Sequence, residues 1–186
     1  MNYRKSQVLP RADVENATGA DKAIFEHVMT TRKLGFMPNM FAVMGLSAPA
    51  LESVASVGEH VRFNCGLDPD VKEIVICEVS SIVGNRFEWC HHFHKVPEEL
   101  QAKVGTGALE DEPAPLGPIV RYCRTLTKGV VDDDLTDQVR ELLGDVLLVD
   151  LTVMIGYYQL LGTFCAALGI EVEDEMPKHP MPLQGT

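Results

Sequence analysis

Residues 71 to 94 read VKEIVICEVSSIVGNRFEWCHHFH, and this stretch decides the fold. Its first half, residues 71 to 83, is apolar nearly all round, which is typical of a helix in the middle of a helical bundle. Gly84 and Asn85 supply a helix stop, and the segment FEWCHHFH predicts a second helix that ends before Pro97. The sequence therefore predicts a buried helix that leads directly into a short polar one.

The rest of the chain divides into further helical segments. Apolar spacing and N-cap or proline signals predict helices over residues 20–32, 47–64, 119–128, 135–143 and 146–168, with a short one after Pro38. Strand-like alternation bounded by hairpin dipeptides is absent, so we expect an all-α helical bundle. Residues 67–84 and 135–156 share an acidic start, an amphipathic turn and a long apolar stretch that ends in glycine, which leaves an internal duplication open.

The length of 186 residues fits one domain that can bury a core without metals or disulfides. We expect an N-terminal arm over residues 1–18, a single all-helical domain over residues 19–170, and an acidic, proline-rich tail over residues 171–186.

The net charge and the cysteine content limit which partners and which cellular compartment are expected. The net charge is −11, and no basic stripe offsets it, so nucleic acid is not expected as a partner. Five widely spaced cysteines, no CxxC pair and no secretory leader predict a cytoplasmic protein. Residues 151–170 reach transmembrane length, but their polar residues and the lack of basic flanks favour a core or interface helix, so no membrane partner is expected.

The segment FEWCHHFH concentrates groups that can carry chemistry. On a helix Glu88 lies one turn before His92, and a carboxylate there can fix the imidazole tautomer or raise its basicity, as a general base requires. The nearest acids that could complete this pair are Glu73 and Glu78 on the preceding helix. An ionised carboxylate on that apolar helix is costly unless it is paired.

Other readings of the same segment remain open. A divalent metal could bind His91, His92, His94 and Glu88, but neighbouring residues point about 100° apart on a helix, so no metal or other cofactor is favoured. Cys90 could be a nucleophile if a neighbouring histidine lowered its pKa. We also place Trp89, His91, His94 and Tyr157 as candidate pocket residues, although burial in the core is more typical of a tryptophan.

The residues of this region resemble those of the carboxymuconolactone decarboxylase and alkyl hydroperoxidase D superfamily. In that superfamily a helix with an early glutamate leads to a short helix that carries either CxxCxxxH or an aromatic-Glu-Trp-x-x-His variant. Here Glu73 stands in the early position, and Phe87, Glu88, Trp89 and His92 spell the second variant. The stretches LGFMPNMFAVMGLSAPAL (34–51) and GYYQLLGTFCAALGI (156–170) look like the opening segment and the closing helix of the family.

The resemblance implies an all-α protein that assembles as a dimer, trimer or hexamer, with a pocket near the subunit contacts. It implies an enzyme, of the lyase type, that performs acid/base chemistry on a small organic acid, lactone or ring compound through Glu73, Glu88 and His92. The CxxC positions fall on Asn85 and Glu88, so the thiol peroxidase chemistry of the hydroperoxidase branch does not carry over. The early Pro97 also alters the lip of the pocket.

Three alternatives to acid/base catalysis stay open at this point. The first is a metal-dependent oxygenase or hydrolase that uses the histidine cluster. The second is a one-cysteine hydroperoxidase that acts through Cys90. The third is a helical oligomer that binds a small ligand without catalysis. The sequence does not give the substrate.

Overall fold

The computed structural model describes Arg4 and residues 6–182, so the first residues of the expected arm and residues 183–186 of the expected tail lie outside the described part. Within that part the chain is helical and contains no strand, which confirms the all-α fold. The α-helices are α1 (Gly19–Thr31), α2 (Asn39–Met44), α3 (Ala48–Glu59), α4 (Pro69–Val83), α5 (Arg86–His92), α6 (Glu98–Gln101), α7 (Leu116–Thr127) and α8 (Asp133–Leu168).

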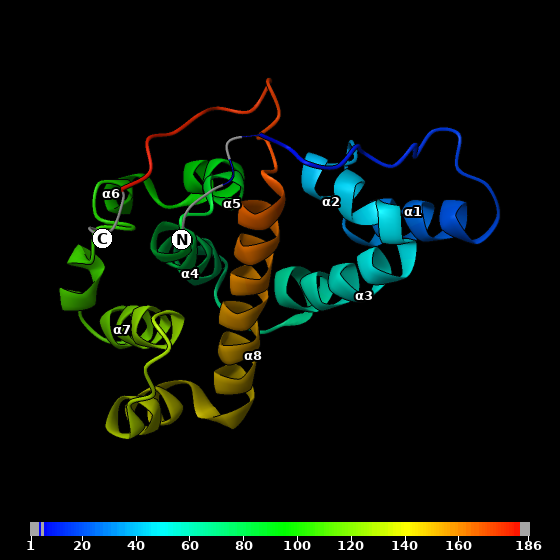
Figure 1. Cartoon of the computed structure of the whole chain (residues 1–186). Helices are drawn as coiled ribbons and strands as arrows, with labels where there is room; N and C mark the ends of the chain where they lie inside the picture. Colours follow the sequence, from blue (N-terminus) through cyan, green and yellow to red (C-terminus); the bar gives the residue numbers. More distant parts are fainter. Residues whose placement is uncertain (1–3, 5, 183–186) are drawn as a thin grey trace.

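The long helix α8 stands between two groups of helices (Figure 1). On one side lie α4 to α7, of which α4 packs against α5, α7 and α8. On the other side α1 packs against α3, with α2 beside them. Residues 170–182 then cross over the end of α8 toward α5 and α6.

Local signals fix both ends of α4 and the start of α5. The Asp68 carboxylate accepts the N–H of Asp70 at 2.9 Å and that of Val71 at 3.2 Å, which caps the helix at its N-terminus. Gly84 ends α4 with φ of 77°, a left-handed conformation that glycine adopts without steric cost. The Asn85 side chain then accepts the N–H of Glu88 at 3.3 Å and starts α5 at once.

Close packing of α4 on α8 forms the centre of the larger core. A Cβ at Gly162 would lie 2.6 Å from Val83 Cγ2, so only glycine permits this approach. Leu151, Met154 and Ile155 of α8 are fully buried in this core. A second, smaller core gathers around Trp89 on the other side of α5, with its members Ile74, Cys77, Cys90, Val96, Val104, Leu109 and Val120.

Four details differ from the sequence-based expectation or refine it. Gly144 breaks α8 with φ of 78° and ψ of 168°, at the point where the sequence predicts the boundary between two helices. Residues His60–Asn64 form a π-helical turn instead of the end of α3. Between the predicted helices, residues Ala108–Asp111 form a 3-10 helix. The histidine-rich helix changes to a 3-10 turn at Phe93–Lys95.

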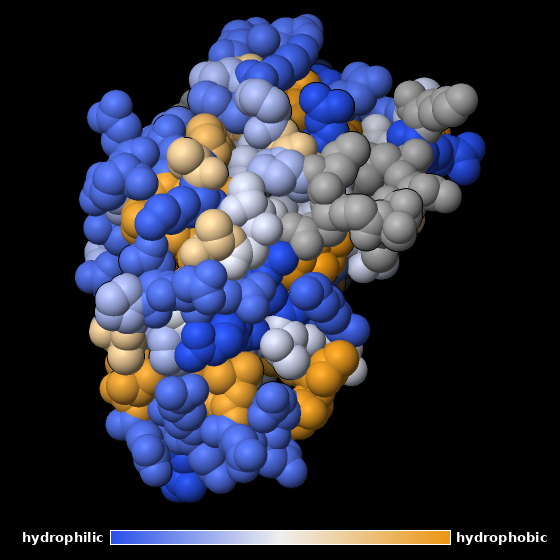
Figure 2. Space-filling view, turned by 90° about the vertical axis from the view of Figure 1, so that its left-hand side faces the viewer, coloured by the Kyte–Doolittle hydropathy of each residue, from blue (hydrophilic) through white to orange (hydrophobic). Residues whose placement is uncertain are grey.

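The surface is mostly hydrophilic, with hydrophobic patches. In Figure 2 the patches lie chiefly in the lower half, level with α7 and the start of α8. Exposed apolar residues in this part of the chain are Val130, Val131, Leu142, Val146 and Val149. By length and composition alone, Asn39–Asn64 and Asp133–Leu168 are each long and apolar enough to cross a membrane, and half of each apolar window is buried within the fold.

Candidate active site

A cavity of about 330 Å³ opens where the two groups of helices meet. Its wall combines the end of α1, the start of α2, the π-helical turn, α5 and α8. Both polar and apolar side chains face it. They are Arg32, Lys33, Leu34, Pro38, Met40, Phe41, Arg62, Phe63, Phe87, Glu88, His91, His92, Lys95, Tyr157, Tyr158 and Leu161.

His92 lies at the centre of a buried chain of three side chains. Its Nδ1 is 2.6 Å from Oε2 of Glu73, and its Nε2 is 3.2 Å from Oε2 of Glu88. All three side chains are buried, and the edge of the imidazole contacts the Tyr158 ring at a centroid distance of 5.9 Å. Glu88 and His92 face the cavity, whereas Glu73 lies behind them on α4. The structure therefore brings together the three residues to which the resemblance assigns acid/base chemistry.

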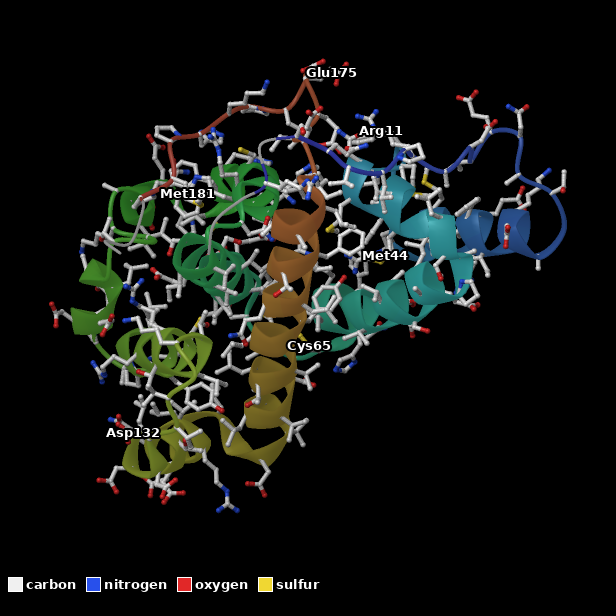
Figure 3. The ribbon with its side chains drawn as sticks, in the orientation of Figure 1. Arg11, Met44, Cys65, Asp132, Glu175 and Met181 are labelled. Atoms are coloured by element: carbon white, nitrogen blue, oxygen red, sulfur yellow. The ribbon has the colours of Figure 1, made fainter. Side chains whose placement is uncertain are left out.

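Arg62 completes this group from the π-helical turn. Its Nη2 lies 2.8 Å from Oε1 of Glu73, so Glu73 contacts an imidazole through one oxygen and a guanidinium through the other. The turn is held at its end by Lys72, whose Nζ donates to the carbonyl of Cys65 at 3.1 Å. Cys65 lies beside α8 where the chain passes from α3 to α4 (Figure 3). Single π-helical turns occur often at functional sites because they redirect side chains, as this one directs Arg62.

Both carboxylates of the group are held in the ionised form. Burial raises the pKa of Glu73, but the hydrogen bond and charge of His92 together with Arg62 outweigh it and hold this pKa at about 2. Burial likewise raises the pKa of Glu88, yet contact with His92 and the charges of His91 and Arg32 bring it below its ordinary value. At neutral pH the two acids therefore act as hydrogen-bond acceptors on either side of the imidazole.

The other two histidines of the histidine-rich segment lie in different places. His91 lines the cavity and lies 2.7 Å from Oε2 of Glu173 through its Nε2. His94 is exposed, does not line the cavity and faces His179 at a ring distance of 6.5 Å. The metal set of His91, His92, His94 and Glu88 is thus not brought together, and among the described residues no three His, Cys, Asp or Glu side chains meet as metal ligands.

Trp89 and Cys90 also lie away from the cavity. Trp89 is 1% exposed and packs in the smaller core, stacked on Phe93 at 4.9 Å, so its assignment to the pocket wall is corrected. Cys90 is 1% exposed and points to the side of α5 that carries the tail, and burial raises its pKa. The condition for a nucleophilic Cys90, a pKa lowered by a neighbouring histidine, is therefore not met. Tyr157 does line the cavity, and burial raises the pKa of its hydroxyl.

Glu78, the other candidate acid of the apolar helix, makes its contacts away from the cavity. It is fully buried, forms an ion pair with Arg124 of α7, and accepts the N–H of Gly105 at 2.8 Å. Sequence patterns did not indicate Arg32, Arg62, Tyr158 or Glu173 as site residues. The position of Arg62 between Val61 and Phe63, just beyond α3, was the one signal that could have indicated it.

Comparison with known proteins places this fold among solved structures. No family model matches the sequence, and no curated protein matches it. The chain is similar to the crystal structure of an uncharacterized peroxidase-related protein from Silicibacter sp. TM1040, with a TM-score of 0.74 and 14% identity. The alignment covers 94% of this chain and 96% of that one. The likeness establishes the fold.

Proposed function

We propose that this protein is an enzyme that transfers protons to or from a small organic acid, lactone or related ring compound. The observation that carries the proposal is the position of His92, which has a buried carboxylate at each ring nitrogen and faces a cavity of small-molecule size. The resemblance of Glu73, Glu88 and His92 to the acid/base motif of the carboxymuconolactone decarboxylase and alkyl hydroperoxidase D superfamily supports the same conclusion.

The geometry gives each residue a role. Ionised Glu73 accepts the Nδ1–H of His92 and so leaves Nε2 as the nitrogen that exchanges a proton. Nε2 lies 3.2 Å from Oε2 of Glu88, and the lowered pKa of Glu88 keeps that carboxylate ionised as an acceptor. Glu88 is therefore the base that faces the substrate, and Nε2 of His92 exchanges the proton with it.

Decarboxylation illustrates how this relay would work. When the carbon–carbon bond to the leaving carboxylate breaks, its electron pair stays on the substrate carbon, and carbon dioxide departs. The proton that quenches this carbanion or enolate passes from Nε2 of His92 through Glu88, and solvent restores it afterwards. Arg62, a lining residue with a permanent positive charge, favours the enolate electrostatically. Isomerisation uses the same removal and return of a proton, and hydrolysis uses the base to activate water.

A peroxidase function receives less support from this chain. The similar solved structure is described as peroxidase-related, but thiol-based peroxidases require a reactive thiolate. All five cysteines are buried, and burial raises the pKa of Cys90. The cavity residues include no cysteine. The carboxylate–imidazole relay thus favours proton transfer over thiol oxidation.

The proposal is tested by following proton exchange into small acids directly. Purified protein is incubated in D2O with a panel of keto acids, carboxylated lactones and ring carboxylic acids, and loss of carbon-bound proton signals is measured by NMR. We expect exchange or decarboxylation of at least one member by the wild type. We expect a loss of roughly 10²-fold or more for Glu88→Gln, because positioned acid/base groups contribute on that scale, and no activity for the double variant Glu73→Gln/His92→Gln.

A matched control comes from a second histidine–acid pair outside the cavity. His60 Nε2 lies 2.8 Å from Asp150, and the His60 side chain is half-exposed. His60→Gln should keep wild-type exchange. Activity that survives the double replacement, or a wild type that transforms no member of the panel, contradicts the proposed function. Assembly into an oligomer and a cytoplasmic location stay predictions.

A further inference from the structure

The cavity concentrates positive charge in a protein of net charge −11. Four basic side chains line it, namely Arg32, Lys33, Arg62 and Lys95, whereas Glu88 is the one carboxylate among the lining residues. Glu88 is already paired with His92. Cationic groups gathered around one cavity repel one another unless an anion balances them, so this wall is suited to a negatively charged ligand.

Several hydrogen-bond donors on this wall have no acceptor within the described part of the chain. They are Nε and Nη1 of Arg32, Nη1 of Arg62 and the hydroxyl of Tyr157, and each of these atoms is shielded from solvent. Tyr157 itself is 5% exposed. Buried donors are nearly always satisfied in native proteins, and an unsatisfied set that converges on one cavity indicates a ligand with acceptor atoms.

The donors are fixed in place by their neighbours. The Arg32 guanidinium carbon lies 5.9 Å from the ring centroid of Phe41 and 5.7 Å from that of Phe63, so two aromatic rings orient its plane without occupying its donors. Glu73 holds the other guanidinium, that of Arg62, at 2.8 Å. These restraints leave the free N–H groups of both arginines positioned before a ligand arrives.

Gly58 of α3 makes room for two of these donors. A Cβ at this position would lie 2.3 Å from the Tyr157 hydroxyl oxygen and 2.9 Å from Nη1 of Arg32. The hydroxyl and the guanidinium therefore converge on the same place beside the helix backbone, and a larger residue would separate them.

We propose that Arg32, Arg62 and Tyr157 form a binding subsite for the carboxylate of a small acid with an apolar or ring-shaped body. Planar guanidinium groups match the two oxygens of a carboxylate, and the tyrosine hydroxyl adds a third donor. Phe87, Tyr158 and Leu161 supply apolar wall for the body of the ligand next to Glu88 and His92. Ionised Glu88 in the same wall selects a monoanion over a dianion such as phosphate. The further statement that this bound acid is the substrate rests on the proposed function.

The subsite is tested by calorimetric titration with benzoate, with its neutral isostere benzamide and with inorganic phosphate. We expect the wild type to bind benzoate at least tenfold more tightly than either of the other probes. Arg32→Met should weaken benzoate at least tenfold and leave benzamide unchanged, whereas Arg32→Lys should recover part of the loss. Tyr157→Phe, which removes only the hydroxyl, should weaken benzoate about threefold to tenfold, and Gly58→Ala should weaken it without removing any donor.

Two controls separate this proposal from the proposed function. Lys22→Met makes the same charge change on the exposed face of α1, where Lys22 lies 3.7 Å from Glu26, and should leave benzoate binding unchanged. Glu88→Gln removes a negative charge from the wall, so it should bind benzoate at least as tightly as the wild type while proton exchange is lost. Equal affinity for benzoate and benzamide, tighter binding of phosphate, or wild-type affinity in Arg32→Met overturns the subsite. Intact binding without any proton exchange overturns the proposed function alone.

Discussion

Helix α4 carries two buried carboxylates whose surroundings differ. Glu73 contacts His92 at 2.6 Å and Arg62 at 2.8 Å, next to a cavity. Glu78 contacts Arg124 and the N–H of Gly105, and its side chain is sealed from solvent. Five positions on a helix separate them by about 140°, so they face different parts of the bundle.

The comparison shows that the partner of a buried acid indicates the role of that acid better than its degree of burial does. An imidazole gains and loses a proton near neutral pH, so Glu73 belongs to a chain along which a proton can move. A guanidinium keeps its proton throughout, so Glu78 and Arg124 can only hold α4 and α7 together. Arg124 also contacts Glu110 at 2.6 Å, which extends this ionic link to the 3-10 helix.

The largest expected effect is a loss of folding stability when the ion pair of Glu78 is broken. Arg124→Met leaves Glu78 buried without its counter-charge, and removal of one partner of a buried ion pair costs about 3–5 kcal/mol of unfolding free energy. Urea denaturation measures this loss, and the variant should retain proton exchange at a temperature where it stays folded. The double variant Glu78→Gln/Arg124→Met should regain a large part of the loss. A cost below about 1 kcal/mol for Arg124→Met would show that the pair does not hold the bundle together.

The sequence predicts the local parts of this comparison better than the distant ones. The cap at Asp68, the stop at Gly84 and the one-turn spacing of Glu88 and His92 are all local, and each has the expected structure. The assignment of Glu73 came from the resemblance, because its contact with His92 spans 19 residues. The partner of Glu78 is 46 residues away on α7, and no local pattern identifies it.

The pocket wall was harder to predict for the same reason. Arg62 reaches Glu73 only because a π-helical turn replaces the last turn of α3. Arg32 lies at the end of α1 and becomes a pocket residue through its packing on Phe41 and Phe63. Trp89 and Cys90 lie in the smaller core and not in the cavity wall, and helical spacing alone does not give the orientation of α5 that places them there.

A smaller effect concerns acid stability, where the two acids of α4 should act in opposite directions. The pKa of Glu73 falls from 4.5 to about 2 in the folded protein, so its contribution is complete above pH 4.5 and is lost as the pH falls toward 2. Glu73→Gln should therefore flatten the decline of unfolding free energy across this window, measured by denaturation at several pH values.

Glu78 provides the opposite case. Burial raises its pKa above 4.5 against the effects of Arg124 and Gly105, so its ionisation lowers stability as the pH rises past 4.5. Glu78→Gln should make the decline on acidification steeper than that of the wild type. Equal pH slopes for the two variants would remove the distinction between the two acids.

The smallest expected effect comes from Glu173, a third buried acid that combines features of the other two. Like Glu73 it contacts an imidazole, that of His91 at 2.7 Å, and like Glu78 it accepts a backbone N–H, that of Asn39 at 2.6 Å. These contacts tie the tail to α2 and α5 beside the cavity. Glu173→Gln should lower the free energy of unfolding by about 1 kcal/mol, since one charged acceptor is replaced by a neutral one, and should speed hydrogen exchange at the Asn39 amide.

Glu175 offers the matched control, because it is an exposed acid at the outermost point of the same tail (Figure 3). Glu175→Gln should change neither quantity. The contacts to His91 and Asn39 also lower the pKa of Glu173 against the effect of burial, so the stabilisation should be present above pH 4.5 and disappear on acidification. Unchanged amide exchange in Glu173→Gln would mean that the tail packs through its apolar residues alone, and the contrast between Glu73 and Glu78 would then not extend to Glu173.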